Sequence, residues 1–142
     1  MSKTPRIRAL IFRISLILYI ILVAYLCFAN FNSLPDVPRQ MFGIRMDKIV
    51  HFCMFFPFPV LCFFAYDKMT DTPLQALGAI LTVLSFGCIF AGLTEIIQGT
   101  MPYRTEDIKD FYADITGMGC SSVITYIADV SKMGKKNKKK RK

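Results

Sequence analysis

Four long apolar stretches alternate with short polar segments along the chain. They cover residues 10–28, 49–65, 74–97 and 111–130. A helix needs roughly 17–25 mostly apolar residues to span a bilayer, so all four reach this length and the second is marginal. Unpaired backbone groups are excluded from hydrocarbon, so each stretch should be helical. The pattern predicts an all-α membrane protein with four transmembrane helices in one small bundle.

Prolines and a capping sequence predict where two of these helices bend or begin. Pro57 and Pro59 lie inside the second stretch, where each removes a backbone donor, so we expect a kink or partial unwinding. The third stretch should start at Thr72, with Pro73 at the first helical position and Gln75 completing a capping box. The first stretch exceeds the roughly 7–15 apolar residues of a signal peptide, so we interpret it as a retained helix.

Charge predicts the orientation of these spans. The chain of 142 residues carries a net charge of +8. With four spans, the side bearing both termini holds 13 of the 18 basic residues and 3 of the 10 acidic ones. Basic loops stay in the cytoplasm, so both termini should be cytoplasmic in a multi-pass protein of the cell membrane. We expect residues 1–131 to form the membrane domain and residues 132–142 a basic cytoplasmic tail.

The basic tail does not indicate a nucleic-acid partner. Its lysines have no interleaved aromatic residues on which bases would stack, so RNA binding is the weaker hypothesis. Clustered lysines beside a span gain roughly 1 kcal/mol each near an anionic lipid surface. Solvation with a purely topological role is the simpler alternative. Membrane lipid is therefore the partner that the composition favours, and the oligomeric state stays open.

Nine polar residues sit at the edges of three of the apolar stretches, and four crossings would place all of them at one face of the membrane. They are Asp47, Lys48, His51, Glu95, Gln98, Arg104, Asp107, Asp110 and Asp114. Charge in or near hydrocarbon is costly, and by default it marks a functional site. Taken singly, each residue is best explained as a structural ion pair. Taken together, nine polar groups on one side favour a site.

Small residues predict how the helices that carry this site pack. Ala91 and Gly87 lie one and two turns before Glu95 on the same helix face, and Ala113 and Gly117 lie beside the acidic stripe of the last helix, which Asp107, Asp110 and Asp114 form. Small residues let helices approach closely in membranes. We expect the two seams to bring the third and fourth spans together, with Glu95 pointing into the bundle.

The nine residues suggest several kinds of chemistry. Lys48 and Arg104 are the expected partners of the buried carboxylates. Asp107, Asp110 and Glu95 offer oxygen ligands that suit magnesium or calcium, although the motifs point to no specific metal and no cofactor. The five cysteines lie inside apolar stretches without a CxxC pair, which favours packing thiols over a disulfide framework.

The order and spacing of three motifs resemble a known family. Asp47-Lys48 with His51-Phe52, then Glu95-x-x-Gln98, then Arg104-x-x-Asp107-x-x-Asp110-x-x-x-Asp114-x-x-Gly117 are similar to the VanZ-like bacterial membrane proteins. The resemblance covers residues 47–119, and the family more usually has asparagine at the position of Asp114. It implies the topology and the site positions. The family takes its name from a protein associated with resistance to teicoplanin-type glycopeptide antibiotics.

Three functions are compatible with these features. The first is a non-enzymatic envelope protein that binds an anionic or sugar-bearing headgroup or a cell-wall precursor. The second is an intramembrane enzyme acting on a lipid-linked substrate, with Glu95 or Asp110 as general base and His51 as its partner; no HExxH or GxSxG motif supports it. The third, a channel or transporter, ranks last because we expect no polar residues in the middle or inner half.

Overall fold

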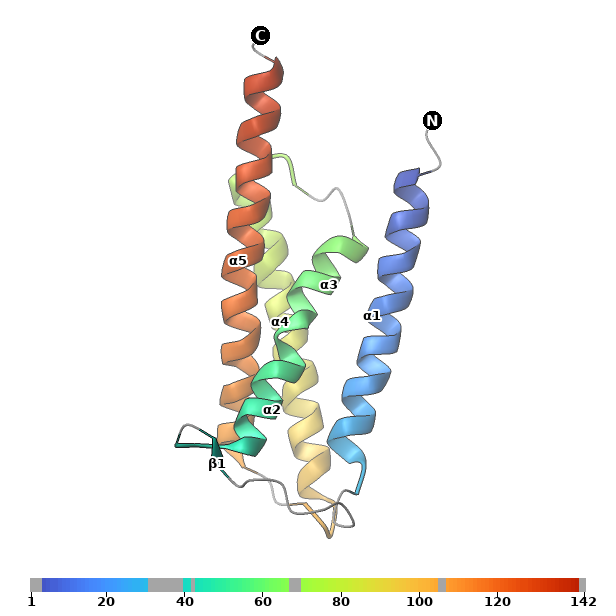
Figure 1. Ribbon diagram of the computed structural model, residues 1–142, viewed down its shortest axis with the longest axis vertical. Coiled ribbons are helices and arrows are strands. Elements are labelled where there is room, and N and C mark those ends of the chain that lie inside the picture. Colours follow the sequence, from blue (N-terminus) through green and yellow to red (C-terminus); the bar gives the residue numbers. More distant parts are fainter. Residues whose placement is uncertain (1–3, 31–39, 42, 67–69, 105–106, 141–142) are drawn as a thin grey trace.

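Five helices make up most of the part of the chain that the structure describes. The computed structural model describes residues 4–30, 40–41, 43–66, 70–104 and 107–140. The helices are α1 (Thr4–Phe28), α2 (Met46–Phe55), α3 (Pro57–Ala65), α4 (Pro73–Gly99) and α5 (Ile108–Lys140). α1, the α2–α3 pair, α4 and α5 run side by side, so that the start of α1 and the end of α5 lie at the same end of the bundle (Figure 1). We call this end the termini end.

The opposite end carries a small hairpin, and we call it the hairpin end. Strands β1 (Gln40–Met41) and β2 (Ile44–Arg45) pair antiparallel. Gly43 adopts a φ of +78° in the turn between them, a conformation that glycine reaches without steric cost. This two-stranded ladder is the one departure, among the described residues, from the expected all-α fold.

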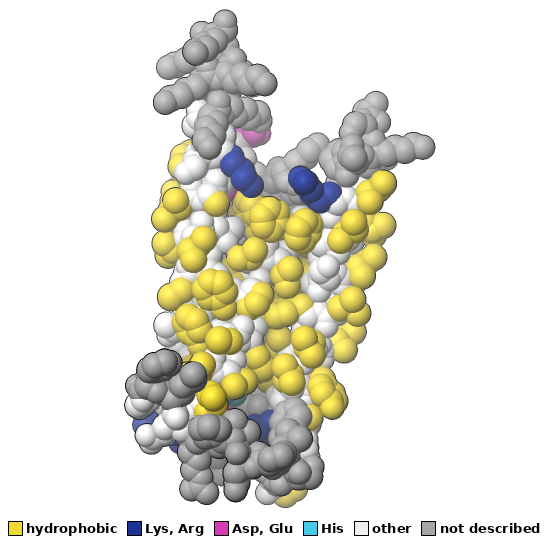
Figure 2. All heavy atoms as spheres, viewed as in Figure 1, with side chains coloured by type: hydrophobic (Ala, Val, Ile, Leu, Met, Phe, Trp, Pro, Cys, Tyr) yellow, Lys and Arg dark blue, Asp and Glu magenta, His cyan; other side chains and the backbone are white. Residues whose placement is uncertain are grey.

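Three helical segments are long and apolar enough to cross a membrane: Ile7–Phe28, Met46–Ala65 and Pro73–Gly99. Large apolar side chains such as Ile17, Leu81 and Phe86 are more than half exposed. Hydrophobic side chains cover most of the middle of the visible face, with basic side chains at its margins (Figure 2). Exposed apolar surface of this extent is typical of a lipid-facing protein. The chain is a multi-pass membrane protein.

The prolines interrupt the second span as the sequence predicts. The helix is broken at Phe56, immediately before Pro57. Phe56 keeps helical backbone angles and its amide still donates to the Phe52 carbonyl oxygen at 3.0 Å. Since Pro57 and Pro59 have no amide hydrogen, the regular bonding pattern stops there while the chain continues in the same direction.

Side-chain caps define where two helices begin. The Thr72 hydroxyl accepts a hydrogen bond from the Gln75 amide at 3.3 Å, which confirms the expected start of α4. The Gln75 side chain reaches one residue further back than in a capping box and accepts from the Asp71 amide. Asp107 precedes α5, and its Oδ1 accepts from the Lys109 amide at 3.0 Å. It is therefore a cap rather than a member of the stripe along the last helix.

Glycines set the distances between helices, and one of the two has the partner that the sequence suggests. A Cβ on Gly87 of α4 would clash with the Met118 sulfur on α5, as expected of a seam between the third and fourth spans, and would lie 3.0 Å from the Phe58 ring. A Cβ on Gly117 of α5 would lie 2.5 Å from the carbonyl oxygen of Phe52 on α2. The expectation that Gly117 faces the third span is therefore wrong, because α5 packs between α2 and α4 and turns this face to α2.

Polar side chains continue along the buried face of α5 toward the termini end. Ser121, Ser122, Thr125 and Asp129 are all buried. Thr125 donates to the Ser121 carbonyl oxygen one turn earlier, and Asp129 accepts from the Thr70 hydroxyl. The expectation of an inner half without polar residues is therefore wrong. The Ser121 and Thr125 hydroxyls remain compatible with an apolar bundle because carbonyls of their own helix accept their protons, whereas the buried Ser122 hydroxyl has no hydrogen-bond partner among the described residues.

Helix α5 crosses the boundary expected at residue 131 without a break. It comprises 33 residues, which corresponds to about 50 Å at a rise of about 1.5 Å per residue. The hydrocarbon core of a bilayer is only about 30 Å thick. The helix therefore continues past the ends of its neighbours at the termini end (Figure 1).

Candidate functional site

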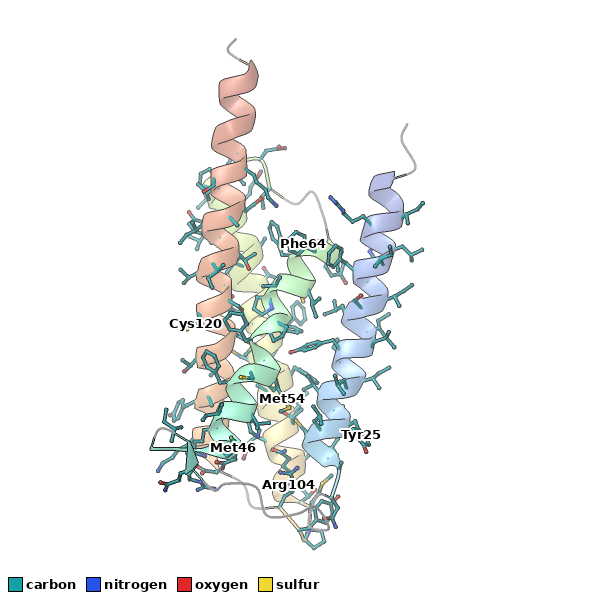
Figure 3. The ribbon with its side chains drawn as sticks, viewed as in Figure 1. Tyr25, Met46, Met54, Phe64, Arg104 and Cys120 are labelled. Atoms are coloured by element: carbon teal, nitrogen blue, oxygen red, sulfur yellow. The ribbon has the colours of Figure 1, made fainter. Side chains whose placement is uncertain are left out.

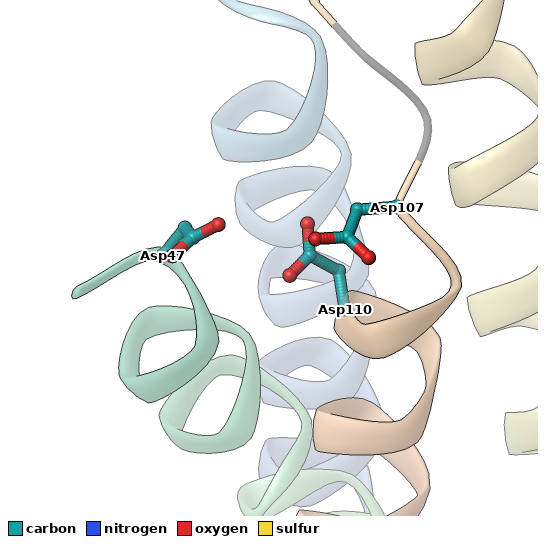
Figure 4. A group of neighbouring side chains, drawn as sticks. All are labelled: Asp47, Asp107 and Asp110. Atoms are coloured by element: carbon teal, nitrogen blue, oxygen red, sulfur yellow. The ribbon is translucent and has the colours of Figure 1, made fainter. Parts of the chain in front are cut away.

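One lysine joins three carboxylates at the hairpin end. Lys48 Nζ lies 2.5 Å from Asp110 Oδ1, 2.8 Å from Asp107 Oδ2 and 3.4 Å from Asp47 Oδ2. α2 supplies Lys48 and Asp47, and the start of α5 supplies the other two. The three carboxylates point toward a common centre between these elements (Figure 4). The ammonium therefore locks the first turn of α2 to the first turn of α5.

Arg45 is a member of this cluster that the sequence analysis missed. Its guanidinium nitrogens lie 2.8 Å from Asp47 Oδ2 and 3.5 Å from Asp107 Oδ2. The side chain is 60% exposed, so the pair contributes little by itself. Its position two residues before Asp47 could have indicated this contact, because β2 ends at Arg45 and α2 begins at the next residue.

The Lys48 ammonium controls the ionisation of the exposed end of the cluster. Its hydrogen bond to Asp107, and after it the bond from the Lys109 amide, hold the pKa of the Asp107 carboxyl below its usual value. Asp107 therefore stays ionised at neutral pH and serves as both the cap of α5 and an acceptor for Lys48.

The three aspartates of the cluster have the geometry of a cation cradle. One oxygen each from Asp47, Asp107 and Asp110 lies within 4.8 Å of the others. Oxygen donors at this spacing suit magnesium or calcium. Lys48 Nζ lies within hydrogen-bond reach of the same oxygens, so a metal ion would compete with the ammonium. The sequence suggested Glu95 as the third ligand, but its Oε1 accepts a hydrogen bond from the Asp107 amide instead. The third carboxylate of the group is that of Asp47.

His51 and Asp114 form a buried pair beneath the cluster. His51 Nδ1 lies 3.0 Å from Asp114 Oδ1, with side-chain exposures of 7% and 0%. The pair joins α2 to α5 about one turn below Lys48 and Asp110. Gly117, one turn further along α5, allows this short distance because its missing Cβ admits the backbone of α2. A histidine held by a carboxylate has its orientation set, which is a requirement of general acid–base chemistry.

Glu95 connects the cluster to α4 and presents an unsatisfied oxygen. Its Oε1 accepts a hydrogen bond from the Asp107 amide at 2.6 Å. Among the described residues, neither Glu95 Oε2 nor Asp114 Oδ2 has a hydrogen-bond partner, although both atoms are buried. A buried acceptor without a donor costs roughly 1–3 kcal/mol. Each of these two oxygens can accept a further hydrogen bond.

Two further predicted residues, together with one that the sequence analysis missed, bind the end of α1. Gln98 Nε2 donates to the Cys27 carbonyl oxygen at 2.9 Å. Arg104 donates to the Leu26 and Ala29 carbonyl oxygens at 3.3 and 3.4 Å, and its side chain lies between α4 and the end of α1 (Figure 3).

The missed residue is Tyr103, whose hydroxyl donates to the Phe28 carbonyl oxygen at 2.9 Å. The last carbonyls of a helix have no partner within it, so Tyr103 and the two predicted side chains together cap α1.

The structure thus divides the nine predicted residues by contact. Lys48 gathers three aspartates, Glu95 is tied to one of them through its amide, and the histidine pair lies directly below. Gln98 and Arg104 belong to the neighbouring cap of α1. The physical reason for this division is that α1 ends at the same level of the bundle as the site.

Searches of this chain against family models, curated proteins and solved structures found no match. The resemblance to the VanZ-like family rests on the three motifs quoted from the sequence.

Proposed function

We propose that this chain is a four-span protein of the bacterial cell membrane whose site faces outward and binds the headgroup of a lipid-linked envelope molecule. In this topology α5 is the fourth span and both termini are cytoplasmic. The start of α1 and the end of α5 lie at one end of the bundle, which supports it, as does the asymmetric distribution of basic residues. The hairpin end then lies at the outer surface.

The observation that carries the proposal is the pair of buried, unpartnered carboxylate oxygens on Glu95 and Asp114. They require hydrogen-bond donors. Lys48, by contrast, already contacts three carboxylates. The site therefore suits hydroxyl and amide N–H groups better than it suits a bare anion. Sugars and peptides of cell-wall precursors carry both kinds of donor.

A binding comparison between two probes tests this chemistry. The purified protein in nanodiscs is titrated with a polyprenyl-diphosphate-linked disaccharide pentapeptide and with the same polyprenyl diphosphate without sugar. We expect the sugar-bearing probe to bind at least tenfold more tightly, and Glu95→Gln to remove most of that difference. Asp71→Asn, a charge loss at the exposed start of α4, is the matched control and should change neither affinity. Equal binding of both probes would refute donor recognition.

The resemblance to the VanZ-like family adds a cellular expectation. We propose that expression of the chain lowers susceptibility to teicoplanin-type glycopeptides by changing how envelope precursors are presented. The measurement is susceptibility of a strain expressing wild type or Glu95→Gln at equal membrane abundance. Unchanged susceptibility with both proteins would reject this part and leave the binding result intact.

A second candidate is an intramembrane hydrolase, and the His51–Asp114 pair favours it. The imidazole, held by the carboxylate, would take a proton from water as the water oxygen bonds to one phosphorus of a lipid-linked diphosphate; the bridging P–O bond then breaks, and its electron pair leaves with the other phosphate as a phosphomonoester. The same sugar-bearing probe serves as substrate, with release of a phosphomonoester as the readout. We expect His51→Asn to abolish turnover, and we expect Asp114→Asn, which can still orient the ring, to retain part of it. No turnover by the wild type would exclude this role.

A further inference from the structure

A cavity of about 500 Å³ lies between α1, α3 and α4, away from the polar site. All three helices contribute side chains to its lining. The residues that line the cavity are almost entirely apolar. They include Leu16, Ile20, Phe63, Tyr66, Ile80 and Phe86. This volume falls within the range of ligand pockets, roughly 300–1,000 Å³.

The cavity begins near the middle of the bundle and extends toward the termini end. On α1 it is lined by Leu16 and Ile20 near the middle of the helix, and after α3 it reaches Tyr66, just past the end of that helix. The surrounding side chains Ile17 and Leu81 are more than half exposed on the lipid-facing surface. A cavity of this character does not attract water, because water needs two or more polar partners. Hydrocarbon is therefore the medium that adjoins it.

A fixed cation stands at the termini end of this cavity. Arg13 lies on the same face of α1 as Leu16 and Ile20, three and seven residues earlier. Its Nε donates to the Ala65 carbonyl oxygen at 3.1 Å, and its guanidinium carbon lies 5.8 Å from the centre of the Tyr66 ring. These contacts hold the side chain in place. The terminal nitrogens carry the other four N–H donors of the guanidinium, in the fork geometry that suits a phosphate.

We propose that this cavity is a phospholipid site, in which one acyl chain fills the space between α1 and α4 while the phosphate of an anionic headgroup binds Arg13. Lipid tails are as apolar as the cavity lining, so the chain by itself gains little by moving from bilayer to cavity. Selectivity for the lipid therefore resides in the charge-assisted bonds of Arg13 to the headgroup. The site is independent of the headgroup site at the hairpin end.

Tryptophan fluorescence offers a direct test, because the chain contains no tryptophan. Phe63→Trp places a single fluorophore in the cavity lining. Leu77→Trp places one on the exposed face of α4, close to the level of Ile80, and serves as the matched control. Each protein is reconstituted in vesicles in which either phosphatidylglycerol or phosphatidylcholine carries brominated acyl chains, at equal mole fraction. The readout is the ratio of quenching by the two brominated lipids.

We expect quenching of Phe63→Trp to favour brominated phosphatidylglycerol at least threefold, whereas Leu77→Trp should be quenched equally by both lipids. Adding Arg13→Gln to Phe63→Trp should return the ratio to that of the control. A ratio that Arg13→Gln leaves unchanged would overturn the role of Arg13. Absence of quenching by either lipid would overturn the site itself, and quenching that falls as protein is concentrated would assign the cavity to a second copy of the chain.

Discussion

A single methyl group at Gly117 should separate the two helices that hold the histidine pair. In Gly117→Ala the new Cβ would lie 2.5 Å from the Phe52 carbonyl oxygen and 3.2 Å from its carbon. Carbon–oxygen contacts settle at about 3.3–3.6 Å, so α2 and α5 must move apart by about 1 Å at this level. The obstacle is backbone, so no rotation of the Phe52 side chain relieves it.

The expected cost follows from three contributions. Overpacking of this kind costs about 1–3 kcal/mol. The better helix propensity of alanine recovers about 0.5–1 kcal/mol. His51 Nδ1 and Asp114 Oδ1, 3.0 Å apart in the structure, would move to about 4 Å, beyond hydrogen-bond range, and loss of that bond adds about 1.5–3 kcal/mol. The net destabilisation should be about 1.5–5.5 kcal/mol.

Two measurements in detergent micelles check this result. One is the free energy of unfolding by chemical denaturant. The other is the imidazole NMR signal, which is unambiguous because the chain contains one histidine. Gly119→Ala is the matched control, since a Cβ at Gly119 meets nothing within 4 Å, and it should be neutral or stabilising. A Gly117→Ala protein with wild-type stability and an unshifted histidine signal would refute the packing argument.

Three other predictions follow from the same contacts. Lys48→Met should destabilise the protein by about 1–3 kcal/mol, because it leaves a cluster of carboxylates without their shared cation, and adding Asp110→Asn should recover part of that loss in the same unfolding assay. The folded-state pKa of Asp107 lies below its ordinary value of 3.8, so its stabilisation is complete above about pH 4 and is lost as pH falls through the lower folded-state pKa. Unfolding curves from pH 7 to pH 2 should therefore show a shallower acid slope for Asp107→Asn, and an identical slope would contradict the assignment. Gln98→Leu should free the Cys27 carbonyl, with faster amide hydrogen exchange at the end of α1 as the readout, and unchanged exchange would show that this bond is dispensable.

Much of the architecture was predictable because it depends on residues close together in the chain. The apolar stretches correspond to helices, and three of them have the length and composition of membrane spans. The Thr72 cap and the break before Pro57 are local as well, since each depends on one amide hydrogen or its absence. The gathering of polar residues at one end also follows from the sequence, because hydrophobic length sets where each helix leaves the hydrocarbon.

The choice of partners was decided only by the tertiary structure. Spacing places Lys48 and Arg104 at the same level, yet one binds three carboxylates while the other donates to carbonyls of α1. Spacing also places Gly117 on a packing face, but not opposite α2. Periodicity gives the relative angle of residues around one helix, whereas a contact depends on how several helices are rotated and ordered around each other. That arrangement is set by the fit of all the helices at once, which no single stretch of sequence contains.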